Sequence, residues 1–334
     1  MKTLRDLTLL RDEPGPVCLA AGYFDGVHRG HQAVIRHARE HARAAGGTAW
    51  AMTFDTHPLK ILQPRTAPRL LTSTPHKLRL LAQLGLDGCL VLPFTRALAE
   101  TEPEAFLDQL GRAIPQLGII LVGSNWRFGR NGRGDIALLR QWAAARGCRV
   151  ALTRPVLRHG APISSTRIRQ AIADGLLAEA AAMLGRPFSL LATVVAGQGR
   201  GRQLGYPTAN LDPHNEVRPP RGVYAVRAVL AGAAYDGVAN FGVKPTVATA
   251  SHPVIEVHLF DAALELYGHE LEVFFFRRLR AERRFASTDA LRAQIARDAA
   301  AARASLAAAP AKNLWIKTLQ VWLPATIVPS EKTK

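Results

Sequence analysis

The chain has 334 residues, a length that accommodates about two domains of ordinary size, each with its own hydrophobic core. Its formal net charge of +17 comes from basic residues spread along the whole chain, so the charge does not indicate a nucleic-acid-binding stripe, and we expect no nucleic-acid partner. Charged residues between Met1 and Pro16 exclude the apolar core of a signal peptide, and no apolar run approaches the roughly 20 residues of a membrane span, so we expect a cytoplasmic protein without a membrane span.

Three cysteines, Cys18, Cys89 and Cys148, lie in apolar runs far apart in the sequence. Neither their number nor their spacing is typical of a disulfide framework or a metal site. We therefore expect buried, reduced thiols and assign them no chemistry.

The first half of the chain alternates short apolar runs with helical patterns. The apolar runs predict strands at 17–21, 48–54, 88–94 and 117–123, and the patterns between them predict helices at 32–45, 75–84, 103–114 and 135–146. Alternating strands and helices are typical of a doubly wound parallel sheet, in which binding sites form at the carboxyl ends of the strands.

The segment 22–31, GYFDGVHRGH, joins the first predicted strand to the first predicted helix. The first turn of a helix has unpaired N–H groups and a partial positive charge, and glycines before it let the backbone approach an anion closely. His28 and His31 are three residues apart, so we expect their imidazoles to point at one spot, where they can donate hydrogen bonds to phosphate oxygens. The predicted phosphate or nucleotide site also includes Gly22, Phe24, Asp25, Gly26 and Gly30.

Two other interpretations remain open for this histidine pair. The imidazoles could bind a metal ion, although no third ligand is evident nearby and the glycines would then have no role. They could also lie on a solvated helix face and have no function.

A hydroxyl cluster begins a second helical stretch in the segment 162–170, PISSTRIRQ. Serine and threonine are good N-caps, so an ordinary helix start is the simplest interpretation. A cap uses only one hydroxyl, however, so it leaves the other hydroxyls and the two arginines unexplained. Guanidinium groups make bidentate contacts with phosphates. The whole group therefore indicates a cradle for a triphosphate, built from Ser164, Ser165, Thr166, Arg167 and Arg169.

The sequence pattern changes at about residue 186, after a helix predicted over 168–185. Short strands are predicted at 190–196, 223–230, 235–241, 254–260 and 271–276, with a hairpin at Ala231-Gly232 and a final helix at 288–308. This pattern indicates a small antiparallel barrel closed by a helix.

A glycine-rich loop, 197–205, follows the first of these strands and leads directly into YPTAN, 206–210. Such a loop on its own is equally consistent with a flexible connector. Its amides could instead wrap phosphates, with candidate residues Gly197, Gly199, Gly201, Arg202 and Gly205. The Thr208 hydroxyl and the Asn210 amide oxygen are hard ligands suited to Mg²⁺.

Glu256 lies in a predicted strand whose alternation places it on the face opposite Ile255 and Val257. An acidic side chain at an inward or rim position is costly unless it is paired or functional. A salt bridge to one of the many arginines is the structural alternative to a catalytic role.

The motifs together resemble the bifunctional riboflavin kinase/FAD synthetase family. The resemblance rests on GYFDGVHRGH and ISSTRIR, on TFDTHP at 53–58 and GSNWRFG at 123–129, and on YPTAN, 237–246 and 255–261 in the second half. It extends from Pro16 to Ala308. Thr56 stands where the family usually has proline and Trp126 where it usually has phenylalanine, which affects contacts on the flavin side.

This resemblance implies an FMN adenylyltransferase domain with a doubly wound parallel sheet at 1–185, a riboflavin kinase domain with a small antiparallel β-barrel and a C-terminal helix at 186–310, and a tail at 311–334 without an assigned role. It implies ATP, riboflavin and FMN as partners and Mg²⁺ as cofactor. The implied catalytic residues are His28, His31, Asn125 and Glu256, with Glu256 as the base for the riboflavin 5′-hydroxyl. The implied flavin contacts are Phe54, His57, Pro58 and Phe128.

Two alternatives remain. One is a related nucleotidyltransferase that acts on another phosphate substrate, since the histidine motif and the ISSTRIR-like loop occur across that superfamily. The other is a non-enzymatic regulator that binds flavin or nucleic acid.

Overall fold

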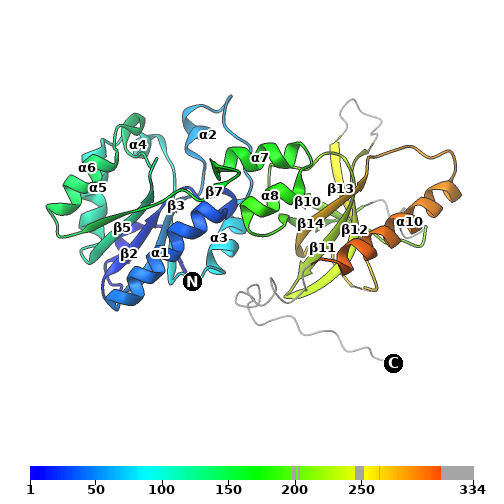
Figure 1. Ribbon diagram of the computed structural model, residues 1–334, viewed down its shortest axis with the longest axis horizontal. Coiled ribbons are helices and arrows are strands. Elements are labelled where there is room, and N and C mark those ends of the chain that lie inside the picture. Colours follow the sequence, from blue (N-terminus) through cyan, green and yellow to red (C-terminus); the bar gives the residue numbers. More distant parts are fainter. Residues whose placement is uncertain (198–200, 202–203, 245–251, 263, 310–334) are drawn as a thin grey trace.

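The computed structural model describes residues 1–197, 201, 204–244, 252–262 and 264–309, which form two lobes joined by a pair of short helices (Figure 1). The first lobe contains a sheet of six parallel strands in the order β1-β4-β3-β2-β5-β6. These strands are β1 Lys2–Leu4, β2 Val17–Ala21, β3 Thr48–Phe54, β4 Gly88–Leu92, β5 Leu117–Gly123 and β6 Arg149–Thr153. The predicted doubly wound parallel sheet is confirmed.

Helices cover both faces of this sheet, which is why its central strands are continuous apolar runs. The helical segments of this lobe are η1 Leu7–Leu10, η2 Asp25–Val27, α1 Arg29–Ala45, α2 Pro58–Leu62, α3 Thr74–Ala82, α4 Arg96–Ala99, α5 Pro103–Ala113, η3 Arg130–Gly132 and α6 Ile136–Ala144. The apolar sides of α1 and α3 pack on one face, and those of α5 and α6 on the other. All three cysteines are buried in this lobe.

The second lobe is a closed antiparallel barrel with the strand order β10-β13-β12-β11-β14-β9. Its strands are β9 Phe188–Val195, β10 Ala209–Pro213, β11 Gly222–Leu230, β12 Ala233–Lys244, β13 His252–Leu259 and β14 Glu270–Arg280. Helix α10, Thr288–Ala307, packs against the outside of the barrel through Ala302 and Leu306. The predicted barrel and closing helix are confirmed, and Ala231 and Gly232, both with positive φ, form the predicted hairpin turn between β11 and β12.

The helix predicted over 168–185 is wrong as a single element. The structure has α7, Ser165–Ala173, and α8, Leu177–Leu184, and the break lies at Gly175, which has a φ of 75°. Glycine adopts this left-handed conformation without steric cost, so it ends α7 sharply. Strands β1, β6 and β10 were also not predicted, and a β7–β8 hairpin, Leu157–Arg158 and Ala161–Pro162, precedes α7.

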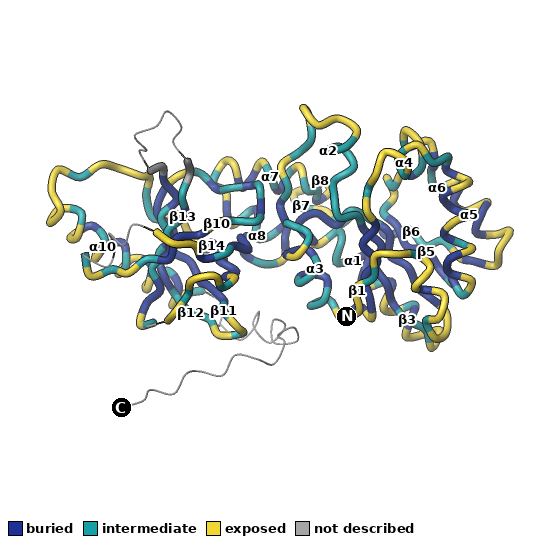
Figure 2. Tube along the Cα trace, turned by 180° about the vertical axis from the view of Figure 1, so that it is seen from behind, coloured by how far each residue is buried: buried dark blue, intermediate teal, exposed yellow. Residues whose placement is uncertain are grey.

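Helices α7 and α8 lie between the lobes and share the hydrophobic core of the barrel (Figures 1 and 2). Ile168 and Ile172 of α7 and Met183 and Leu184 of α8 are buried in the same cluster as the inner residues of the barrel strands. Figure 2 shows the buried trace running through both lobes and this junction. The two lobes therefore meet across a packed interface.

A buried polar network also crosses this interface. His76 of α3 lies 2.9 Å from the Glu272 carboxylate of β14, and Ser189 of β9 donates to the same carboxylate at 2.8 Å. The Asn215 amide donates to the other ring nitrogen of His76 at 3.2 Å. Burial acts to raise the pKa of Glu272, but His76, Ser189 and the nearby Arg186 outweigh it and hold that pKa below its usual value.

Candidate active sites

The strand order of the sheet reverses between β2 and β5, so their carboxyl ends open a crevice at a topological switch point. The loop after β2 carries the histidine motif, and the loop after β5 carries Asn125. Because ligands of open α/β sheets bind at such points, the fold brings the two predicted motifs to the expected place.

The turn between β2 and α1 has an unusual backbone. Phe24 and Val27 have φ values of 57° and 42°, and Gly26 lies between them at 77°. Left-handed conformations cost a non-glycine residue about 1–3 kcal/mol and are rarest for β-branched residues such as valine. Such a turn persists only when its surroundings hold it in place.

Asp25 provides part of that support. Its buried carboxylate accepts hydrogen bonds from the backbone N–H groups of Leu71 and Thr72 and forms an ion pair of 2.7 Å with Arg169. The Asp25 carbonyl accepts a hydrogen bond from the Ser165 hydroxyl at 3.0 Å. Asp25 therefore connects the first motif to the second.

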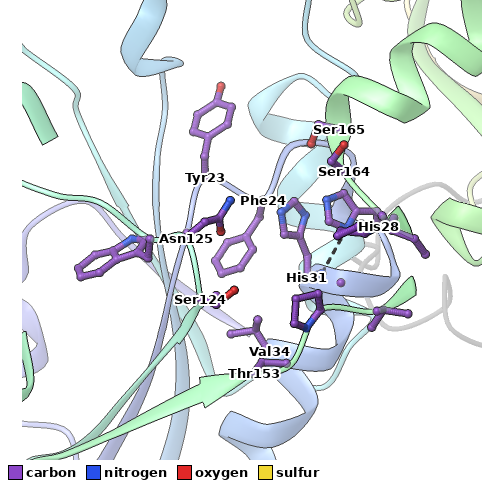
Figure 3. Close-up of a pocket in the computed structure, with 18 of the residues that line it drawn as sticks. Tyr23, Phe24, His28, His31, Val34, Ser124, Asn125, Thr153, Ser164 and Ser165 are labelled. Carbon is purple, nitrogen blue, oxygen red and sulfur yellow. Dashed lines mark hydrogen bonds between the residues drawn. The ribbon is translucent and has the colours of Figure 1, made fainter. Parts of the chain in front are cut away.

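His28 caps the N-terminus of α1, and its ring stacks on His31 with 3.6 Å between the centroids (Figure 3). The His28 Nδ1 accepts from the His31 backbone N–H at 3.3 Å, so the neutral imidazole carries its proton on Nε2. The Nδ1 of His31 is buried and has no hydrogen-bond partner among the described residues. A ring nitrogen of each histidine thus remains for a ligand.

Both imidazoles are neutral at physiological pH. Burial, with a contribution from the charge of Arg186, lowers the pKa of His28 to about 4. Burial, the neighbouring His28 and Lys77 hold the pKa of His31 well below its usual value. The free pair can therefore donate hydrogen bonds without carrying charge.

The N-terminus of α7 faces the histidine pair (Figure 3). Ser164 is its N-cap and accepts from the Arg167 backbone N–H at 3.3 Å. The N-termini of α1 and α7 thus approach one space, and both favour anions through their free N–H groups and dipoles.

A cavity of about 540 Å³ lies between these elements. It is lined by residues of 21–24, 123–127, 153–156 and 162–165 and by the first turns of α1. Figure 3 shows His28 and His31 between the two serines on one side and Ser124 and Asn125 on the other. Of the predicted site residues, the cavity brings together Gly22, Phe24, His28, Gly30, His31, Asn125, Ser164 and Ser165.

The other predicted residues of this module do not line the cavity. Thr166 is exposed, and the Arg167 guanidinium donates to the backbone carbonyls of Arg158, Ala161 and Pro162, which fixes the β7–β8 hairpin. The set outside the cavity lining comprises Asp25, Gly26, Phe54, His57, Pro58, Phe128, Thr166, Arg167 and Arg169, and the last of these is paired with Asp25.

Two aromatic residues of this set, Phe128 and His57, pack against residues that line the cavity. Phe128 is 7% exposed and stacks on Trp126, which lines the cavity, with 4.6 Å between the centroids. The His57 ring packs edge-on against Tyr23, another lining residue, at 4.5 Å, and Phe54 packs edge-on against Phe94 at 5.1 Å. Pro58 begins α2 directly after His57.

Sequence reasoning missed two basic residues that line this cavity, Arg127 and Arg154. Arg154 follows β6, so its position would have been expected if that strand had been recognised. Arg127 lies inside the GSNWRFG segment, and its positive charge beside Asn125 was a usable signal.

The second site lies in the barrel. Glu256 of β13 is directly opposite Asn210 of β10 on one side and Asn240 of β12 on the other. Directly opposed residues of antiparallel strands project from the same face of the sheet, so the three polar side chains form a row. Ile255 and Val257 are each 1% exposed, as the predicted alternation requires.

The glycine-rich loop packs closely on the YPTAN segment. A Cβ atom on Gly197 would lie 1.9 Å from the Asn210 amide nitrogen, and one on Gly201 would lie 2.9 Å from the Thr208 hydroxyl. A side chain at position 197 would displace the Asn210 amide, and one at position 201 would also meet the backbone carbonyl of Tyr206. Gly205 has a φ of 83°, and the predicted Gly199 and Arg202 lie outside the described residues.

His258, which sequence reasoning also missed, fixes the same segment. Its Nδ1 lies 2.8 Å from the Pro207 carbonyl, and its ring packs edge-on against Tyr206. A pocket of about 100 Å³ opens beside Thr208, with walls that include Val194 and Leu259. Thr208 thus lines this pocket, and Asn210, two residues further along the chain, belongs to the polar row of Glu256.

Oxygen ligands of this kind suit a hard divalent cation that is also held by a polyphosphate. Across the described part of the chain, no group of three or more His, Cys, Asp or Glu side chains could hold a metal ion. The Thr208 hydroxyl and the Asn210 amide oxygen are donors that fit Mg²⁺ held together with a nucleotide.

Comparison with known proteins identifies the two lobes. A family model described as FAD synthetase matches residues 10–167, and one described as riboflavin kinase matches residues 184–306. The bifunctional riboflavin kinase/FMN adenylyltransferase of Escherichia coli K12 is 40% identical over 305 residues, which cover 91% of this chain and 97% of the relative. The chain belongs to the bifunctional riboflavin kinase/FAD synthetase family.

Other members of the family are similarly close. The protein of the same description from Pseudomonas fluorescens is 38% identical, over 91% of this chain and 97% of its own. The Bacillus subtilis protein is 35% identical, over 87% of this chain and 92% of its own. A solved structure described as a macrolide-efflux protein from Streptococcus pneumoniae superposes with a TM-score of 0.79 at 30% identity and covers 91% of this chain and 99% of that one.

The sheet lobe is thus the FAD synthetase module of this family, and the barrel is the riboflavin kinase module. Residues 168–183, which include most of α7 and α8, fall between the two matched regions. Within the described residues, no helix has the length and apolar character needed to cross a membrane.

Proposed function

We propose that this chain phosphorylates riboflavin with ATP to give FMN and ADP in the barrel, and then joins FMN to AMP from a second ATP in the sheet module, giving FAD and pyrophosphate. The observation that carries this proposal is that one chain of this family holds two separate polar sites. The first is the stacked His28–His31 pair at two helix N-termini, and the second is the row around Glu256. We place both reactions in the cytoplasm, where the two substrates and ATP occur together.

In the adenylyl transfer, an oxygen of the FMN phosphate attacks the α-phosphorus of ATP, and the bond to the bridging oxygen of pyrophosphate breaks. The protein positions two anions and stabilises the charge that develops on the α-phosphate. The Nε2–H of His28 and the His31 ring donate hydrogen bonds to that phosphate, with Asn125 opposite them (Figure 3). Ser164, Ser165 and the α7 N-terminus receive the β and γ phosphates.

The flavin ring requires an apolar wall at the other end of the cavity. Trp126 and Tyr23 are the aromatic residues that line the cavity beside Phe24, and Phe128 and His57 pack behind them. We therefore propose Trp126 and Tyr23 as the direct flavin contacts and Phe128 and His57 as their supports.

In the kinase reaction, the Glu256 carboxylate accepts the proton of the riboflavin 5′-hydroxyl as the oxygen attacks the γ-phosphorus, and ADP leaves. The neighbouring Asn210 and Asn240 orient this carboxylate and the nucleotide. Thr208 and Asn210 supply oxygen ligands for Mg²⁺, which when bound neutralises phosphate charge. The amides around Gly197 and Gly201 contact the phosphates.

The test is incubation of the purified protein with riboflavin and Mg-ATP, followed by separation of the flavins. We expect FMN to appear first and FAD to accumulate from it, with no FAD when Mg²⁺ is chelated. A different adenylylated product would instead indicate the related nucleotidyltransferase, and unchanged riboflavin in a folded sample would contradict the kinase assignment. Supplying FMN with Mg-ATP tests the second step alone.

A further inference from the structure

Arg186 follows α8, one of the two helices at the junction between the lobes (Figure 1), and precedes β9. It falls inside the region matched by the riboflavin kinase model, yet its side chain reaches into the FAD synthetase motif. Its Nη2 donates to the Gly26 carbonyl at 2.9 Å, and its Nη1 lies 3.4 Å from the Val27 carbonyl.

These two carbonyls belong to the strained turn that ends at His28. Gly26 and Val27 both have positive φ, and the peptide that follows Val27 leads directly into the N-cap of α1. Gln32 of α1 also donates to the Val27 carbonyl, at 2.8 Å. The orientation of this peptide sets the direction in which the His28 side chain leaves the backbone, so donors to its carbonyl control the imidazole.

The guanidinium of Arg186 is poorly placed for a purely stabilising role. Its Nε is buried and has no hydrogen-bond partner among the described residues. No carboxylate lies within ion-pair distance of it in the described part of the chain, although Glu272 is close enough to act on its charge. Burial lowers the pKa of Arg186 to about 10, so the group remains charged at neutral pH. Burying a charge under these conditions is costly.

We propose that Arg186 is a positioning residue for adenylyl transfer, supplied by the kinase half of the chain, which fixes the turn that presents His28. This inference rests on the proposed function of the sheet module. It makes the FAD synthetase site dependent on a residue outside the region matched by its own family model.

The positive charge of Arg186 has a second effect on the site. It faces His28 together with Arg169 and the His31 ring, and these groups are the charged and titratable neighbours that act on that imidazole. A cation at this position disfavours protonation of the free His28 and leaves its Nε2–H as a neutral donor. Once phosphates occupy the cavity, the same cation attracts them.

The experiment compares Arg186→Met and Arg186→Lys with the wild type in the full chain, and measures riboflavin phosphorylation and FAD formation from supplied FMN. For Arg186→Met we expect kcat for FAD formation to fall about 10- to 100-fold, because small displacements of a catalytic group cost rates of this size. The KM for ATP should change much less, and the kinase rate should stay within about twofold of the wild type. Arg186→Lys should restore part of the lost kcat.

Because Arg186→Lys keeps the positive charge that Arg186→Met removes, the pKa of His28 in the two variants separates the loss of this charge from a loss of packing. By NMR, we expect the His28 pKa of about 4 to rise towards its usual value in Arg186→Met and to change little in Arg186→Lys. The matched control is Arg79→Met, which removes the ion pair with Glu270 across the same interface without touching the turn. Both activities of that variant should equal those of the wild type.

FAD formation by Arg186→Met within twofold of the wild type would overturn the proposal. An equal loss of both activities would overturn it as well, since it would show a general loss of folding; if Arg186→Met does not fold, the same comparison on Arg186→Lys decides. Absence of FAD formation in the wild type itself would instead contradict the proposed function of the module.

Discussion

The carboxylate of Asp25 and the guanidinium of Arg169 form a 2.7 Å ion pair between residues that are 144 positions apart in the chain. The pair joins the turn that precedes His28 to helix α7, whose N-cap is Ser164. The turn before His28 and the N-terminus of α7 are therefore fixed relative to each other by a contact that does not itself line the cavity.

Replacement of Arg169 by Met tests this arrangement. The substitution leaves the buried Asp25 carboxylate without its cation, so we expect the free energy of unfolding to fall by about 3 kcal/mol in a urea titration. FAD formation should fall at least tenfold because α7 and the turn lose their alignment. Gln170→Ala, which removes only a hydrogen bond to Asp174 on the same helix, is the control and should retain both properties.

Removal of both imidazoles separates the two activities. In His28→Ala/His31→Ala the donors to the α-phosphate are lost, and we expect FAD formation from FMN to drop by about two to three orders of magnitude, the cost of removing such a donor. Riboflavin phosphorylation in the same chain should continue at its normal rate. Parallel loss of both products in a folded sample would contradict independent sites.

Glu256→Gln is the reciprocal experiment. The amide keeps the shape of the side chain but cannot accept the 5′-hydroxyl proton, so we expect kcat for riboflavin phosphorylation to fall by about two to four orders of magnitude. FAD synthesis from supplied FMN should be unaffected. A kinase rate near that of the wild type would rule out Glu256 as the base.

The buried histidine pair also makes stability depend on pH. The pKa of His28 is about 4 in the folded protein and near 6.5 when the chain unfolds, so the unfolded state binds more protons between these values. The corresponding stability, about 3 kcal/mol for His28 alone, is fully present above pH 6.5 and is lost as the pH falls towards 4. Unfolding titrations from pH 7 to pH 4 should therefore show a shallower decline for His28→Ala than for the wild type, and equal slopes would contradict the low pKa.

Much of the fold and part of the candidate site could be predicted from the sequence. The apolar runs of β2, β3, β4 and β5 mark a sheet buried on both faces, and residues that directly follow β2 and β5 line one cavity. The local pattern was sufficient to predict this cavity because the carboxyl ends of all parallel strands lie at the same edge of the sheet.

The remaining features depend on contacts that no local pattern encodes. Arg167 has a side chain of the type that binds phosphate, but in the fold its guanidinium donates hydrogen bonds to three backbone carbonyls of the preceding hairpin. Phe128 has the character of a flavin-stacking residue, yet the chain turns it into the core behind Trp126. The direction of both side chains is set by tertiary packing, so residue type alone does not determine it.

The buried cysteines of the sheet lobe, Cys18, Cys89 and Cys148, allow the opening of one half of the molecule to be measured by thiol alkylation. The chain has three cysteines in all, and none belongs to the barrel. Burial raises the pKa of all three thiols, which makes them unreactive while the sheet is closed. The rate of cysteine alkylation in the native protein therefore measures local opening of the sheet lobe alone. A change in that rate on adding riboflavin would show that ligand binding in the barrel is coupled to opening of the sheet lobe.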